Sequence, residues 1–232
     1  MKREEHALEF LDRPLPADVL AASLADLDHL NQRYGGHWLA LREVMRRIDA
    51  LPATGPPATI VDVGGGRGDF ALRLVARAHE RDRSIRVIVV DRDATAAALA
   101  RRHCAHVPEI TVVQGDATAL PLRERGVDVA VSVLTLHHLD VDGAATMLAE
   151  MRAASRDALI VVDLPRRRLA WLAVWLTTRL QRCHPVSRHD GPLSVRRAYS
   201  VDELRTLADK ARLANVTVRR FPLLLRVVLV AS

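Results

Sequence analysis

The sequence predicts an α/β fold: a doubly wound, mostly parallel sheet of seven strands with helices at its N-terminal end. Short runs rich in Val and Ile alternate with amphipathic helical segments from residue 58 onward. Strands that are buried on both faces of a parallel sheet read as such nearly continuous apolar runs. The last two apolar runs are too close together for a crossover helix between them, which predicts an antiparallel pair at one edge of the sheet.

The first 57 residues are expected to form a helical lid. Apolar residues in 17–30 recur near the period of an α-helix, and the pair Gly35-Gly36 interrupts this pattern before residues 37–51 resume it. The Pro-rich segment 51–57, LPATGPP, ends the helical region and reads as a linker. Residues 58–232 then form the main domain.

Within the main domain the alternation is regular. Strands are expected at 59–63, 85–91, 110–114, 127–134 and 158–164, and helices at 69–81, 94–104 and 142–155. Ser200 and Glu203 form a capping box for a helix that runs from Val201 to about residue 213. Strands at 216–221 and 224–231 complete the sheet, and residues 165–199 read as a helix and loop insertion.

Composition narrows the class of protein. Hydrophobic residues make up 49% of the 232 residues, enough for a sizeable core without disulfides or metals. The two cysteines, Cys104 and Cys183, have no metal-ligand spacing, so we expect a reduced cytoplasmic chain without a metal site. The charged opening MKREEHALEF is no signal peptide, and the apolar stretch 169–176 is far shorter than the ~20 residues of a spanning helix.

The net charge of +6 comes from one segment. Six arginines and no acid lie between Asp163 and Asp190. Aromatic residues are only 3% of the chain and are not interleaved with these arginines, so nucleic acid is not a favoured partner. The apolar, arginine-flanked stretch Arg166–Arg182 is compatible with weak contact to an anionic membrane surface, with a wall for a ligand pocket, or with a helix that simply covers the sheet.

A glycine-rich loop, VDVGGGRGDFA (61–71), follows the first predicted strand. Ligands of open parallel sheets bind beyond the carboxyl ends of the strands, and glycines there let a ligand approach the backbone. Residues 66–71 also fit the dinucleotide pattern G-x-G-x-x-A, which leaves an NAD(P)-dependent oxidoreductase as an alternative. However, Asp62 and Asp69 bracket the loop, and carboxylates favour an ammonium or sulfonium over a pyrophosphate.

Further polar residues follow the next three strands. Asp91 ends the second strand and is placed to accept hydrogen bonds from a ribose diol, while Asp116 after the third could accept from an exocyclic amine. The fourth strand leads into LTLHHLD (134–140).

Four motifs, VDVGGGRGD, VVDRD, VVQGDATALPL and VDVAVSVLTLHHL, resemble in order those of class I S-adenosylmethionine-dependent methyltransferases. The resemblance covers about residues 58–164 and implies a Rossmann-like fold, with S-adenosyl-L-methionine as cofactor and S-adenosyl-L-homocysteine as product. It implies that the methionine part is surrounded by Asp62, Gly64, Gly65, Gly66 and Gly68. It implies that Asp91 holds the ribose, Arg92 flanks the adenine, Asp116 and Ala117 read its edge, and Ser132, Val133 and Leu134 pass under the sulfonium.

The same resemblance restricts which kinds of molecule could accept the methyl group. Methyltransferases of base amino groups carry an Asn/Asp-Pro-Pro-aromatic motif after the fourth strand, and the catechol type carries metal-binding acids there; neither is present. The His-His pair is similar to that of enzymes that methylate phenols, enols and carboxylates of natural products, including polyketides. We therefore expect a small, fairly hydrophobic acceptor methylated at oxygen, with C-methylation of a polyketide or quinone-like acceptor, or a non-catalytic binding domain, as alternatives. A monomer and a homodimer are equally compatible with the sequence.

Three histidines are candidates for the general base. His137 and His138 follow the fourth strand, and His189 is expected in the loop before the last helix. Each could instead pack or cap a helix, and an acceptor that is already an anion needs positioning more than a base. His37 is a weaker candidate, and Tyr34 and Trp38 could close over the cofactor from the N-terminal helices.

Overall fold

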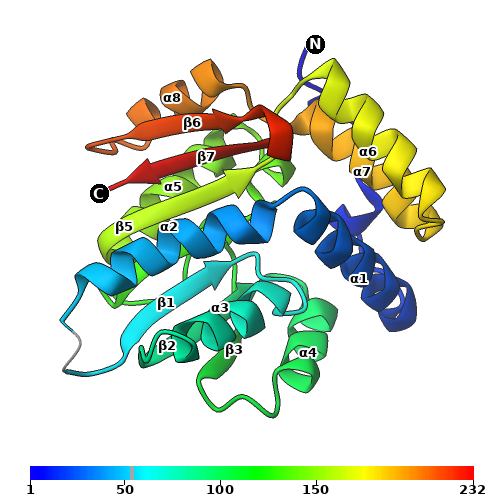
Figure 1. The fold of residues 1–232 in the computed structure, drawn as a ribbon. Helices are drawn as coiled ribbons and strands as arrows, with labels where there is room; N and C mark the ends of the chain where they lie inside the picture. Colours follow the sequence, from blue (N-terminus) through cyan, green and yellow to red (C-terminus); the bar gives the residue numbers. More distant parts are fainter. Residues whose placement is uncertain (53–54) are drawn as a thin grey trace.

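A computed structural model describes residues 1–52 and 55–232 and contains the predicted seven-stranded sheet (Figure 1). The strand order is β3-β2-β1-β4-β5-β7-β6, with β1 to β5 parallel and β7 antiparallel to both of its neighbours. The strands are β1 (Ala58–Val63), β2 (Ile85–Asp91), β3 (Ile110–Gln114), β4 (Val127–Val133), β5 (Ser155–Asp163), β6 (Thr217–Phe221) and β7 (Arg226–Ala231). The predicted fold class is confirmed.

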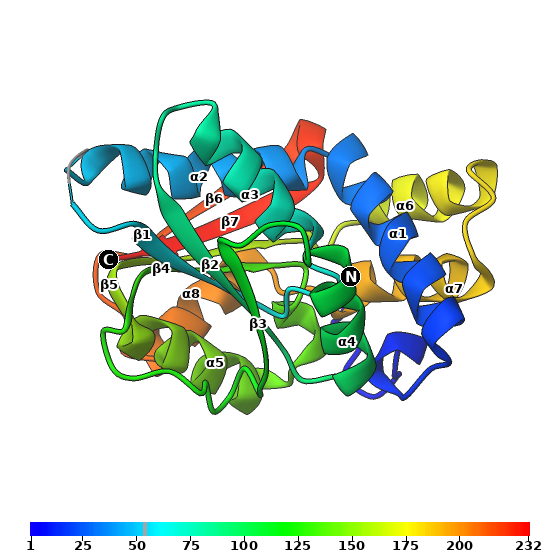
Figure 2. The ribbon, with the colours of Figure 1, turned by 90° about the horizontal axis from the view of Figure 1, so that it is seen from below.

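Helices cover both faces of the sheet and also lie beyond its carboxyl edge (Figures 1 and 2). They are α1 (Ala17–Arg33), α2 (Gly36–Ala50), α3 (Asp69–His79), α4 (Ala94–His103), α5 (Val141–Ala154), α6 (Arg168–Leu180), α7 (Pro185–Arg197) and α8 (Val201–Lys210). Short 3-10 turns are η1 (Phe10–Asp12), η2 (Leu136–His138) and η3 (Pro222–Leu224). The apolar sides of α2 and α3 pack on one face of the sheet, and those of α5 and α8 pack on the other.

The alternating side chains of β1 divide the core between these two faces. Ile60 packs in the cluster with α2 and α3, whereas Val61 and Val63 pack in the cluster with α5 and α8. Because α2 belongs to this core, the described part of the predicted lid that lies over the carboxyl edge of the strands is α1 with the segment before it. The linker predicted at 51–57 lies partly outside the described residues.

The insertion between β5 and α8 differs from the expected helix and loop. The segment expected as a loop forms a second helix, α7, which packs against α6 (Figure 1). Gly191 and Pro192 lie inside α7, and both are buried. Residues that usually break a helix are tolerated there because tertiary packing, rather than helix propensity, holds the segment. His189 is therefore a helix residue, and its predicted place in a loop was wrong.

No helix among the described residues is long and apolar enough to cross a membrane.

Candidate functional site

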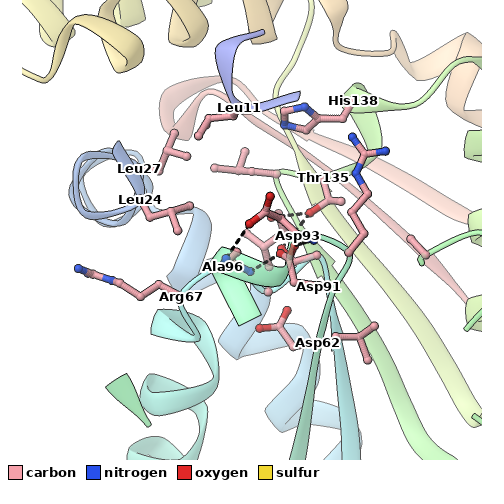
Figure 3. A pocket seen from close by; sticks show the side chains of 18 of the residues that line it. Leu11, Leu24, Leu27, Asp62, Arg67, Asp91, Asp93, Ala96, Thr135 and His138 are labelled. Atoms are coloured by element: carbon pink, nitrogen blue, oxygen red, sulfur yellow. Dashed lines mark hydrogen bonds between the residues drawn. The ribbon is translucent and has the colours of Figure 1, made fainter. Parts of the chain in front are cut away.

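A cavity of about 220 Å³ lies at the carboxyl ends of β1, β2 and β4, where the strand-end loops face α1 and the segment that contains η1 (Figure 3). Its floor carries the glycine loop, and its opposite wall carries leucines from the N-terminal segment and α1. The predicted ligand loop therefore faces the N-terminal segment and α1, in which the sequence shows no ligand-binding motif.

The glycine loop packs closely against the side chains that surround it. Gly64 has φ +72°, and a Cβ there would lie 2.3 Å from Thr135 Oγ1. A Cβ on Gly65 would lie 2.6 Å from Val89 Cγ1 and 2.8 Å from Asp62 Oδ2. Side chains at these two positions would therefore collide with the walls that hold the loop.

Asp62 is the most unusual group in the cavity wall. Its side chain is 1% exposed, and its Oδ2 has no hydrogen-bond partner among the described residues. Burial, with the charges of Asp91 and Asp69 adding to it, raises the pKa of this carboxyl to about 7. A cationic ligand would give the buried oxygen the partner that the protein itself does not supply.

Asp91 ties the glycine loop to the second strand. Its Oδ2 accepts a hydrogen bond from the Gly66 amide at 2.9 Å, and its Oδ1 accepts one from the Asp93 amide at 3.0 Å. Burial raises the pKa of Asp91, and these two amides act in the opposite direction. Asp93 caps α4 by accepting from the Ala96 amide, as Figure 3 shows. The carboxylate thus holds the loop in place and faces the cavity.

Most predicted cofactor residues line the cavity. They are Asp62, Gly64, Gly65, Gly66, Asp91, Arg92, Asp116, Ala117, Val133 and Leu134. Two do not. Ser132 is fully buried and donates to the Val63 carbonyl at 2.8 Å, and Gly68 backs onto Cys104, whose Sγ would lie 2.6 Å from an added Cβ. Both residues support the loops from behind.

The three candidate bases have separate environments. His138 lines the cavity (Figure 3), and its Nδ1 lies 2.7 Å from Asp12 Oδ1. His137 is buried behind the wall, with its Nδ1 2.7 Å from Asp163 Oδ1. His189 lies outside the cavity wall and pairs with Asp190.

The N-terminal aromatic and histidine candidates are placed elsewhere. His37 lines the cavity but its Nε2 is taken by Asp28 at 2.9 Å. The Tyr34 hydroxyl is 2.6 Å from Thr177 Oγ1 in α6, and Trp38 is 52% exposed with Arg42 over its ring. Neither aromatic residue lines the cavity.

The apolar wall was missed in the sequence. It consists of Leu11, Leu20, Leu24, Leu27 and Leu139. The three leucines of α1 were recognised only as one side of an amphipathic helix, and periodicity does not distinguish a side that covers a cavity from one that covers a core.

Comparisons with known proteins agree with this geometry. Residues 60–157 match the family model described as Methyltransferase domain. In sequence, the chain is 36% identical over 93 residues to ribosomal RNA small subunit methyltransferase A of Synechococcus sp. (strain RCC307). That match spans 40% of this chain but only 32% of the relative.

Solved structures resemble the fold of this chain beyond the residues that the family model matches. A putative O-methyltransferase from Nostoc punctiforme PCC 73102 aligns with 97% of this chain and 63% of its own, at TM-score 0.66 and 16% identity. The CurJ carbon methyltransferase aligns with 84% of this chain and 53% of its own chain, with a TM-score of 0.62 and 14% sequence identity. Magnesium protoporphyrin IX methyltransferase from Synechocystis PCC 6803, with bound SAH, aligns with 84% of this chain and 83% of its own chain. The TM-score is 0.56 and the sequence identity is 17%.

The Synechocystis structure contains SAH, the demethylated form of S-adenosyl-L-methionine. The cavity residues fit S-adenosyl-L-methionine on two counts. The unpartnered oxygen of Asp62 suits its ammonium, and the absence of a side chain at Gly66, where an added Cβ would lie 3.4 Å from Leu24 of the cavity wall, leaves space beside the loop. Carboxylates of Asp62, Asp91, Asp93 and Asp116 on the wall make the cavity electrostatically favourable for a ligand with two positive groups.

Proposed function

We propose that the protein transfers a methyl group from S-adenosyl-L-methionine to an oxygen of a small, fairly hydrophobic acceptor. The observation that carries this proposal is the division of the cavity wall into two parts. Glycine-loop and strand-end carboxylates line one side, and the other side has leucines beside His138, with Asp12, Asp28 and His37 among them. The first part suits the charged cofactor, and the second suits an apolar acceptor.

The chain's own residues would position the reactants. Asp91 would accept hydrogen bonds from ribose hydroxyls, Asp116 and Ala117 would contact the adenine edge, and Asp62 would face the ammonium. The bound cofactor supplies an electrophilic methyl group on its sulfonium. The leucines of α1 would exclude water from the acceptor and hold its oxygen toward that methyl group.

His138 is the residue on this wall that could take a proton from the acceptor. A carboxylate only accepts hydrogen bonds, so the 2.7 Å contact to Asp12 fixes a proton on Nδ1 and leaves the lone pair on Nε2. We propose Nε2 as the general base. His137 would position neighbouring residues rather than contact the acceptor, because it lies behind the cavity wall.

Cofactor binding and methyl transfer can be tested separately. Calorimetry with S-adenosyl-L-homocysteine should show micromolar binding that Asp91→Ala weakens strongly. With methylatable phenols and enols, His138→Gln should lower kcat by about 10²–10⁴-fold while leaving cofactor affinity nearly unchanged. Wild-type protein that binds no cofactor would contradict the proposal, and equal activity of His138→Gln would contradict the base.

C-methylation is the main alternative, and the structural likeness to a carbon methyltransferase supports it. The ¹³C NMR shift of the transferred methyl group distinguishes an O-methyl from a C-methyl product, because a methyl carbon bonded to oxygen is strongly deshielded. A ribosomal RNA acceptor, suggested by the name of the relative in Synechococcus, is less well supported. The chain has LTLHHL where base-methylating enzymes carry their Pro-Pro motif, and the cavity wall is acidic.

We also propose a weak contact between α6 and an anionic membrane surface. Leu169, Leu172, Leu176 and Leu180 recur at helical spacing and are 46–77% exposed. Arg166 does not take part, because Glu203 and the Ala198 carbonyl hold it against the protein. Arg167, Arg168, Arg179 and Arg182 are the cations that remain near this helix.

A further inference from the structure

Three side chains from distant parts of the sequence converge beside the acceptor end of the cavity. His137 Nε2 lies 3.9 Å from Glu9 Oε1, and His138 Nε2 lies 3.8 Å from Glu9 Oε2. One potential ligand atom from each residue lies within 4.8 Å of the other two. The two N···O distances are too long for hydrogen bonds. They are close to the separation of two ligands that share one ion at about 2.0–2.2 Å, once the side chains move in by a few tenths of an ångström.

Each histidine is oriented as a metal ligand would be. The Nδ1 of His137 pairs with Asp163 and the Nδ1 of His138 pairs with Asp12, both at 2.7 Å. Histidines that bind metals in proteins commonly donate their other ring N–H to a carboxylate, which fixes the tautomer and directs the free nitrogen at the ion. Here that arrangement occurs twice, on two adjacent residues, and both free nitrogens are the ones near Glu9.

Glu9 provides an independent indication of a missing partner. It is 1% exposed, and Ser194 donates to its Oε2 at 2.9 Å. Its Oε1 has no hydrogen-bond partner among the described residues, although it faces His137 Nε2. A buried carboxylate oxygen without a hydrogen-bond partner carries a desolvation cost, which a directly bound cation would offset.

The local charge also favours a dication. Glu9, Asp12 and Asp163 surround the two histidines, and the cation in direct contact with this group is Arg197. Arg197 lies 3.6 Å from Glu9 Oε1 and also pairs with Asp12. Three carboxylates against one guanidinium leave an excess of negative charge, so a divalent ion would bring the cluster close to neutrality.

We propose that Glu9, His137 and His138 form a binding site for a divalent transition-metal ion of the Zn²⁺ class. Two imidazoles and one carboxylate suit such an ion better than Mg²⁺ or Ca²⁺, and three protein ligands leave a coordination position open. Because His138 also lines the cavity, the open position is on the acceptor side, where an acceptor oxygen could bind and be polarised.

This site shares an atom with the proposed base. The single lone pair of His138 Nε2 cannot hold a metal ion and accept a proton at the same time. In the metal-bound protein the ion would acidify the acceptor oxygen, and in the metal-free protein His138 would take its proton. Metal binding itself depends on neither the cofactor nor an acceptor, so its test is independent of methyl transfer.

The experiment is to titrate full-length protein with Zn²⁺ against a chromophoric chelator, and with Co²⁺ by visible absorption. We expect one ion per chain and a Co²⁺ spectrum with nitrogen ligation. Glu9→Gln and His138→Gln should each weaken Zn²⁺ binding at least 10-fold, and Asp12→Asn should weaken it about 10–100-fold through His138. Circular dichroism verifies that each variant is folded.

His79→Gln is the matched control. His79 pairs with Glu109 at 3.0 Å on the surface, so it presents an imidazole and a carboxylate without the second histidine. Wild-type affinity in His79→Gln supports the proposed site. Binding that is lost in His79→Gln but kept in folded Glu9→Gln and His138→Gln, or no stoichiometric binding in the wild type, would overturn it.

Discussion

A single buried carboxylate, that of Asp62, shows how the cofactor site costs stability. Its oxygen has no partner among the described residues, and burial raises its pKa from 3.8 to about 7. The folded state therefore holds a proton that the unfolded state has lost between about pH 4 and pH 7. Stability is greatest below the unfolded pKa and falls as pH rises through 7. Such a cost is typical of a position kept for ligand binding.

Asp62→Asn should consequently stabilise the protein at pH 8 and change little near pH 4. The upper bound of the gain is about 4 kcal/mol, at about 1.4 kcal/mol for each pKa unit. Urea unfolding at several pH values measures it, and calorimetry should show weaker cofactor binding by the same variant. Asp202→Asn, at an exposed position, is the control. Equal destabilisation of Asp62→Asn at every pH would contradict this account.

A site residue can be predicted from the sequence when its position follows from its own strand. It cannot be predicted when its position depends on residues far away in the sequence. Asp62, Gly64 and Asp91 could be placed at the cavity from the sequence because each lies at or just after the carboxyl end of a strand, where ligands of parallel sheets bind. Glu9 could not be found, because its partners His137 and His138 are more than a hundred residues away and no spacing links them. The same holds for Leu11, which reaches the cavity from a segment with no periodic pattern.

At the scale of elements, α7 is where sequence reasoning failed for a physical reason. Gly191 and Pro192 indicate a loop, yet the structure places them in a helix whose Pro185 occupies the favourable first turn. This helix holds the N-terminal segment, because the Asp190 carboxylate accepts from the Phe10 amide at 2.9 Å and the Leu11 amide at 3.0 Å. The strands were predictable because their apolar runs are continuous, whereas α7 depends on contacts distant in sequence.

Asp190→Ala should release this segment. Loss of two charge-assisted hydrogen bonds should cost about 1–3 kcal/mol in the free energy of unfolding. It should also weaken cofactor binding, since Leu11 and Asp12 form part of the cavity wall. Urea unfolding and calorimetry measure the two effects. His189→Ala changes the neighbouring residue outside the wall and should affect catalysis little; a large loss of kcat there would restore His189 as a base.

The exposed side of α6 gives a second prediction at this scale. The wild-type protein should co-sediment with vesicles that contain anionic lipid at low salt, and less so at high salt. The double variant Leu169→Ser/Leu180→Ser should lose this binding, because these side chains are 77% and 73% exposed. Asp202→Asn again serves as the control. Protein that stays in the supernatant at low salt would show that α6 only covers the domain.

For the whole molecule, the sheet order follows from alternating strands and helices with a final antiparallel pair, and all seven strands were predicted. What could not be predicted is how residues 1–33 cross the carboxyl edge of that sheet. Their position depends on pairings such as Tyr34 with Thr177 and Arg226 with Asn31, which join segments more than a hundred residues apart. The sequence therefore locates the glycine loop, and the tertiary structure alone locates the leucine wall that we propose for the acceptor.

Cofactor binding should accordingly stabilise the whole chain and protect its N-terminal segment. A ligand that binds only the folded state at 100 times its Kd adds about 2.7 kcal/mol to the free energy of unfolding. S-adenosyl-L-homocysteine should raise the melting midpoint and slow proteolysis within residues 1–33, because α1 and the segment before it form one wall of the cavity that the ligand would fill. NAD(P) should do neither, since Asp62 and Asp69 disfavour a pyrophosphate at the loop. Stabilisation by NAD(P) without stabilisation by S-adenosyl-L-homocysteine would instead favour the oxidoreductase alternative.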